Sequence, residues 1–180
     1  KVLEANKNIT DYLTLKDKNK ELINENKALL ANLVRYQQLA KNPLGLYHPD
    51  SIFASRFEFN VAKVIKNSSH LPNNYLTIDK GTADGIEPGM GVICPQGVVG
   101  QVMQCSDHFS RVYSILHSEF NVSSEVRNQA LRVKSDKALG IAKWGGLNPR
   151  VIDLTTIDRF KPIKKGDSVT TSEQNVIFPS

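Results

Sequence analysis

The stretch MGVICPQGVVGQVMQ, residues 90–104, decides the fold class of this chain. It holds two runs rich in β-branched residues, Met90 to Cys94 and Val98 to Gln104, on either side of the turn sequence Pro95-Gln96-Gly97. Val and Ile favour extended backbone, and a short connection that contains Gly favours a tight reversal of the chain. The stretch therefore predicts an antiparallel β-hairpin.

The same pattern continues on both sides of this hairpin, from Ser51 to the end of the sequence. Short runs of β-branched and aromatic residues are separated by Gly, Pro, Asn and Asp, which is typical of all-β sandwiches and barrels. The other predicted strands are residues 57–65, 75–79, 112–116, 121–127, 131–134, 139–143, 151–154 and 168–171. About ten short strands suit two small β-barrels better than one large barrel. We therefore expect a first β-barrel over residues 52–108, a second over 109–157, and final strands over 158–180 that can return to the first barrel.

A helical pattern precedes the β region. Between Ala5 and Ala40 the chain has no Pro and no Gly, and Lys, Glu, Leu, Asn and Ala dominate, so an α-helix is expected. Its apolar side chains follow the heptad pattern of a coiled coil, and Leu at every seventh position is the plainest sign. The expected dimer interface consists of Tyr12, Leu15, Asn19, Leu22, Asn26, Leu29, Leu33 and Tyr36. Pro43 and Gly45 then end the helix, which gives a coiled-coil helix over residues 1–41 and a hinge over 42–51.

Two asparagines in this seam predict how the helices pair. Asn19 and Asn26 occupy successive inner positions of the heptad, where paired amides hydrogen-bond across a parallel dimer and disfavour larger assemblies. We therefore expect a parallel homodimer. Ile9, Ile23 and Leu30 widen the apolar stripe, so a trimer remains open, as does a helix that folds back on its own β region.

Composition argues against several functional classes. The formal charge of +5 comes from 23 basic and 18 acidic residues, and the basic residues are spread thinly, unlike the concentrated basic face of a nucleic-acid-binding protein. Cys94 and Cys105 lie several rungs apart in the predicted hairpin, so we expect buried free thiols and no zinc site. No apolar run approaches the roughly 20 residues that a membrane span needs. We expect neither a cofactor nor a metal.

One motif points to a different class of protein. Gly166-Asp167-Ser168 is similar to the nucleophile motif of chymotrypsin-like serine hydrolases, which are also double β-barrels. Val169 follows Ser168 where those enzymes have Gly, and a turn that leads into a strand explains the residues equally well. We therefore expect no enzymatic activity and keep a hydrolase that uses Ser168 as the alternative. A stalk connector of a secretion or adhesion system is a third hypothesis, with the same architecture and other partners.

Four aromatic residues are candidates for binding a partner. Phe53, Phe57 and Phe59 lie where the β region begins, beside the expected hinge, and Trp144 stands at the end of a predicted strand, before two glycines. Large aromatic side chains are enriched at protein interfaces, although at strand spacing they also form cores.

Six short motifs follow one another through the β region. They are NYLTIDKG (residues 74–81), DGI (84–86), GMGVI (89–93), GVVGQV (97–102), KGDSVTTS (165–172) and IFP (177–179). In this order, and preceded by a coiled coil, they resemble the signature of the MreC family, the cell-shape-determining proteins of rod-shaped bacteria.

The resemblance implies a fold, a location and a set of partners. Two β-barrels would lie in the periplasm, and the helix would follow a single span of the inner membrane that lies upstream of this chain. The protein would be a non-catalytic scaffold of the peptidoglycan-synthesis complex that elongates the cell. Its partners would be MreB, MreD, RodA and a class B penicillin-binding transpeptidase.

Overall fold

The computed structural model describes residues 2–40, 57–133, 136–173 and 175–179. Two compact units make up the chain, residues 1–61 and residues 62–180, and each is described by itself. The architecture is mainly β with an N-terminal helix, as the sequence predicts. The hinge expected over residues 42–51 lies outside the described residues.

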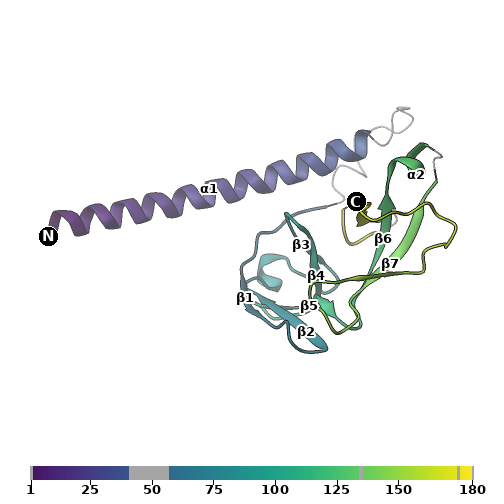
Figure 1. The fold of residues 1–180 in the computed structure, drawn as a ribbon. Coiled ribbons are helices and arrows are strands. Elements are labelled where there is room, and N and C mark those ends of the chain that lie inside the picture. The colour runs from purple at the N-terminus through teal and green to yellow at the C-terminus, as the bar shows by residue number, and fades with distance from the viewer. Residues whose placement is uncertain (1, 41–56, 134–135, 174, 180) are drawn as a thin grey trace. The chain divides into compact units, whose positions relative to one another are not determined.

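The first unit is dominated by one continuous helix, α1, which spans Val2–Ala40 (Figure 1). Its length follows from the absence of helix-breaking residues, because Pro and Gly first occur after Ala40. The predicted helix is therefore confirmed.

The first sheet of the second unit has five antiparallel strands in the order β1-β2-β5-β4-β3. The strands are β1 (Val64–Asn67), β2 (Asn73–Ile78), β3 (Gly91–Cys94), β4 (Gly97–Cys105) and β5 (Ser110–His117). The predicted hairpin of residues 90–104 is confirmed as the pair β3 and β4, which a two-residue turn connects because Cys94 pairs with Gly97. A short 3-10 helix, η1 (Thr82–Asp84), lies between β2 and β3.

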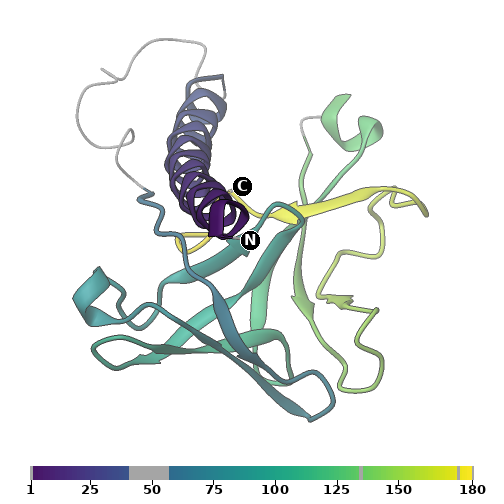
Figure 2. The same cartoon turned by 90° about the vertical axis from the view of Figure 1, so that its left-hand side faces the viewer.

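The second sheet has four antiparallel strands in the order β8-β7-β6-β9. The strands are β6 (Asn121–Arg127), β7 (Ala138–Lys143), β8 (Asp153–Thr155) and β9 (Ser168–Thr171), and a short helix, α2 (Gln129–Val133), follows β6. Figure 2 shows the two sheets as separate curled layers, the first in teal and the second in green to yellow.

The boundary between the sheets differs from the expected one. We expected the first barrel to end at residue 108, but β5 pairs with β2 and β4, so the first sheet extends through His117. The final strand β9 does not return to the first sheet, since it pairs with β6. Both differences have the same cause. Which strands pair over long sequence separations depends on register and packing, and the spacing of apolar residues within single strands does not reveal either.

Residues 131–134 were expected to form a strand, and this expectation is wrong for residues 131–133, which belong to α2. The side-chain oxygen of Asn128 accepts a hydrogen bond from the backbone N–H of Leu131 at 2.8 Å. This is the bond of an N-cap residue to the third residue of its helix. Gln129, Ala130 and Leu131 are good helix formers, so the cap and the propensity together favour a helical turn.

Three apolar clusters form the core of the described part of the β region. The first belongs to the first sheet and contains Leu76, Ile78, Ile86, Val102 and Val112. The second lies between the sheets and contains Phe120, Val122 and Phe178, packed against Ile93, Val98, Tyr113, Ile115 and Ala142. The third belongs to the second sheet and contains Val126, Leu131 and Ala138. The middle cluster, which we call the junction core, joins side chains of both sheets.

The two cysteines are free thiols, as expected. They are not both buried, however, because Cys94 is exposed at the β3–β4 turn and Cys105 is half-buried at the other end of β4. The expectation of burial is therefore wrong for Cys94.

Candidate partner-binding surfaces

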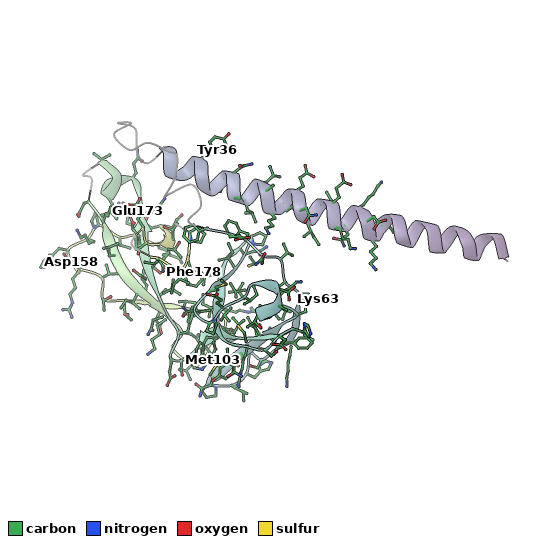
Figure 3. The ribbon with its side chains drawn as sticks, turned by 180° about the vertical axis from the view of Figure 1, so that it is seen from behind. Tyr36, Lys63, Met103, Asp158, Glu173 and Phe178 are labelled. Atoms are coloured by element: carbon green, nitrogen blue, oxygen red, sulfur yellow. The ribbon has the colours of Figure 1, made fainter. Side chains whose placement is uncertain are left out.

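The predicted seam of α1 is a row of exposed apolar side chains. Leu15, Leu22, Leu29 and Tyr36 are 66, 56, 57 and 70% exposed, and Tyr36 points away from the helix in Figure 3. Covering a large apolar side chain contributes roughly 1.5–3 kcal/mol. In a single helix, the side chains of this row stay in contact with water, so this stabilisation is absent. The surface is therefore suited to a second apolar helix.

The inner positions of the seam share this exposure. Leu33 is 51% exposed, and Asn19 and Asn26 are exposed as well, while the side chain of Tyr12 lies outside the described residues. Leu30 beside the seam is 45% exposed, whereas Ile23 is half-buried. The pairing of two helices through these residues stays a prediction.

The aromatic candidates that the structure describes differ in how deeply they are buried. Phe53 lies outside the described residues, and Phe57 and Phe59 are half-buried in an irregular segment that precedes β1. Trp144 is only 3% exposed, and its indole N–H donates to the backbone carbonyl of Asn148 at 2.9 Å. The expectation for Trp144 is corrected: the loop after β7 folds over the ring and satisfies its donor, so the side chain is a core residue and not an exposed anchor.

Phe178 is a core residue, and in the sequence it stands out only as the middle residue of the IFP motif. Its side chain is 2% exposed and stands edge-to-face against Phe120, with ring centroids 6.4 Å apart. Figure 3 labels Phe178 inside the second unit. The backbone N–H groups of Ile177 and Phe178 both donate to the side-chain oxygen of Asn175, which fixes the turn that carries the ring. The IFP motif therefore closes the junction core.

Gly91 on β3 makes room for this ring. A Cβ atom at position 91 would lie 2.6 Å from a carbon of the Phe178 ring and 2.9 Å from the carbonyl oxygen of Ile177. Real carbon atoms do not approach so closely, so only glycine fits without movement of the ring. The GMGVI and IFP motifs, far apart in the sequence, thus meet at one contact.

The NYLTIDKG and DGI motifs build a tight turn at η1. The Asp84 carboxylate accepts a hydrogen bond from the backbone N–H of Gly81 at 3.2 Å and lies 2.6 Å from the Lys80 ammonium. The hydrogen bond between the two side chains raises the pKa of Lys80 and lowers that of Asp84. Gly85 follows with a φ of 79°, a left-handed conformation that glycine adopts without strain. These motif residues therefore stabilise the turn at η1.

The Gly-Asp-Ser sequence is also a turn followed by a strand. The Asp167 carboxylate accepts hydrogen bonds from the side chain of Asn128 at 2.7 Å and from the backbone of Lys164 at 2.8 Å, and both bonds lower the pKa of Asp167. Ser168 is exposed at the start of β9, where it pairs with Arg127. Among the described residues, no histidine hydrogen-bonds to Asp167 or Ser168. The relay that a serine nucleophile requires is not assembled in this part of the chain.

Comparison with known proteins decides the family. The family model described as rod shape-determining protein MreC, barrel core, matches residues 64–180, which include all nine strands described above. The chain belongs to the MreC family. The cell shape-determining protein MreC of Listeria monocytogenes is 30% identical over 121 residues, which make up 66% of this chain and 39% of that protein.

Solved structures support the same family. The structure of MreC from Listeria monocytogenes aligns with a TM-score of 0.58 at 25% identity, over 88% of this chain and 71% of that one. A structure of the major periplasmic domain of the cell shape-determining filament MreC aligns with a TM-score of 0.50 at 22% identity, over 67% of this chain and 74% of that one, which shows a shared fold. The chain spans 39 and 45% of the lengths of the two curated relatives it matches, the second from Haemophilus influenzae.

MreC proteins are structural proteins of cell shape, and two further observations describe this chain. Within the described residues, His, Cys, Asp and Glu do not gather in groups of three that could hold a metal ion. No helix in the described ranges is both long enough and apolar enough to cross a membrane.

Proposed function

We propose that this chain is a non-catalytic scaffold that maintains cell shape by pairing with a second copy and positioning proteins of peptidoglycan synthesis. The observation that carries the proposal is the exposed heptad row of Leu15, Leu22, Leu29 and Tyr36 on a helix of 39 residues. Such a row is stable in water when a partner helix covers it.

The two asparagines give the pairing a direction. Asn19 and Asn26 are exposed at inner heptad positions, and their amides satisfy each other when the same layer of a second helix faces them. In a parallel pair, each layer meets its own copy. Both β regions then emerge from the same end of the rod, so that one assembly presents two equal binding modules.

The family relationship supports the setting of this scaffold. Membership in MreC gives a role in cell shape, and one structural relative is named as a periplasmic domain. We place the β region in the periplasm, behind an upstream span of the inner membrane. MreB, MreD, RodA and a class B penicillin-binding transpeptidase are the proposed partners, and the expected β-barrel domains are the proposed docking modules.

Sedimentation equilibrium of the full chain tests the pairing. We expect a dimer for the unchanged chain and a monomer for the Leu22→Lys/Leu29→Lys variant, because two charges in the seam face the same charges on the second helix. The matched control is Asn24→Lys/Ala31→Lys, which adds the same charge at exposed positions outside the seam. A control variant that dissociates as readily as the seam variant, or an unchanged chain that is monomeric, would refute the proposed pairing.

Co-purification tests the scaffold role separately. The unchanged chain and both double variants, each carrying its upstream segment, are expressed in a rod-shaped bacterium and captured from solubilised membranes. We expect the four proposed partners with the unchanged chain and the control, and reduced recovery of at least one of them with the seam variant. Recovery of none of them with a dimeric chain would contradict the scaffold role while leaving the pairing intact.

A further inference from the structure

A buried histidine lies where the first sheet passes into the second. His117 ends β5 and is 1% exposed. Two tyrosine rings stand edge-on to it, Tyr75 with a centroid distance of 5.0 Å and Tyr113 with 4.8 Å. The guanidinium of Arg111 lies 3.8 Å above the Tyr75 ring. The imidazole is therefore enclosed by aromatic groups of β2 and β5.

Hydrogen bonds to His117 hold the short connection between the two sheets. Only Ser118, Glu119 and Phe120 separate β5 from β6. The backbone N–H of Glu119 donates to Nδ1 of His117 at 3.1 Å, and the N–H of Phe120 donates to the His117 carbonyl at 3.0 Å. The ring thus holds the turn that delivers Phe120 to the junction core.

These contacts fix the protonation state of the ring. Because Nδ1 accepts a hydrogen bond, the proton of the neutral imidazole is assigned to Nε2. Nε2 is buried, and no hydrogen-bond partner for it lies among the described residues. A second proton would have to sit on Nδ1 and would point at the N–H of Glu119, so two donors would face each other. The charged imidazole cannot keep this turn.

The charged groups around the ring act in opposite directions. Burial lowers the pKa of His117 below its ordinary 6.5, Arg111 on β5 lowers it further, and the carboxylate of Glu119 in the turn raises it. Tyr75 on β2 and Tyr113 on β5 face the imidazole with the edges or faces of their rings. On the side of the junction core, Phe120 of the connection and Val122 of β6 are apolar. Burial is the largest of these effects, so the neutral ring is favoured in the folded chain.

We propose that His117 is a pH-sensitive latch on the connection between the two sheets. The neutral ring holds residues 118–120 in place, and protonation releases the turn and loosens Phe120 against Phe178. Because the neutral form belongs to the folded state, the latch is closed above pH 6.5, the ordinary value for histidine, and opens progressively as the pH falls below it. The latch goes beyond the scaffold role and does not depend on it.

Amide hydrogen exchange of the full chain tests the latch, with rates corrected for the intrinsic effect of pH. Protection of the Glu119 and Phe120 amides is expected to fall by up to about tenfold per pH unit below the ordinary histidine pKa, as uptake of one proton requires. Amides in the centre of β5, such as Val112, should keep their protection. The His117→Asn variant offers an acceptor close to the position of Nδ1 but binds no proton, so its protection should not depend on pH. The matched control is His70→Asn, because His70 is exposed in the connection between β1 and β2 and its replacement should leave the pH dependence unchanged.

Direct titration gives a second readout that needs no variant. Histidine side-chain NMR of the unchanged chain should show His117 titrating below 6.5, the ordinary histidine value, together with a shift of the Glu119 amide at the same midpoint. Titration of His117 at or above 6.5 would overturn the proposal. It would also be overturned if Glu119 and Phe120 stayed protected while His117 took up its proton, or if His117→Asn kept the pH dependence.

Discussion

Replacement of Phe178 by Ala should destabilise the second unit more than any other change near the end of the described chain. The ring is 2% exposed and contributes to a core that both sheets share. Truncation of a buried Phe to Ala costs about 3–5 kcal/mol, and an edge-to-face aromatic pair such as that with Phe120 adds about 0.5–1.5 kcal/mol beyond its area. Whole domains have a free energy of unfolding of about 5–15 kcal/mol, so this change removes a large share of it.

Urea denaturation at neutral pH measures this loss, because Trp144 is the single tryptophan of the chain and is buried in the second unit. With a slope of about 2 kcal/mol per M, a loss of 3–5 kcal/mol lowers the midpoint by about 1.5–2.5 M. The control is Val176→Ala, since Val176 is 74% exposed two residues away and should shift the midpoint little. Equal shifts for the two variants would refute the junction core as described.

A double-mutant cycle sharpens the same test. Gly91→Ala alone should destabilise the chain, because its new methyl group would overlap the Phe178 ring. In the Phe178→Ala background the ring is absent, so the loss caused by Gly91→Ala should become smaller. Additive losses would show that the two motifs do not touch.

Three further predictions concern other parts of the chain. Asn128→Ala should lower the free energy of unfolding by at least the roughly 1 kcal/mol that loss of an N-cap costs, with Gln129→Ala as an exposed control, measured by urea denaturation. Asp167 has a lowered pKa, so its hydrogen bonds stabilise the chain above pH 3.8, the ordinary value, and this contribution is lost as the pH falls through the folded-state pKa. Asp167→Asn should therefore flatten the acid limb of the stability–pH curve, and an unchanged limb would contradict the assignment. In the proposed helical pair, Asn19→Val/Asn26→Val should raise the melting temperature and admit trimers, which light scattering detects as a higher mass. A strict dimer would contradict the role proposed for the two asparagines.

Much of the secondary structure was predictable because its signals are local. The strands β6 and β9 have the bounds that the sequence predicts, residues 121–127 and 168–171. The strand predicted over 131–134 is wrong at residues 131–133, because a run of four residues is too short to distinguish the period of a strand from that of a helix. The deciding signal was Asn128, which stands before good helix formers and caps them.

The candidate surfaces likewise divide into features with a local sequence signal and features that depend on distant parts of the chain. The heptad row of α1 could be read from spacing alone, because residues on one face of a helix recur at fixed intervals. The burial of Trp144 could not, since it depends on a loop that brings the Asn148 carbonyl to the indole. The contact of Phe178 with Gly91 was likewise hidden, because no periodicity relates residues on different sheets.

The position of β9 along the chain affects the time at which this protein can finish folding. The strands β1 to β5 follow one another and complete the first sheet before the second begins, whereas β6 receives its neighbour β9 only from the end of the described chain. Chains emerge from the ribosome at about 5–20 residues per second, so the first sheet can assemble seconds before the junction can close. During that interval Phe120 and one edge of β6 stay uncovered. The second sheet can therefore close only after residues 168–171 have been synthesised. A chain that ended before them would expose an unpaired edge of β6, which chaperones or proteases could recognise.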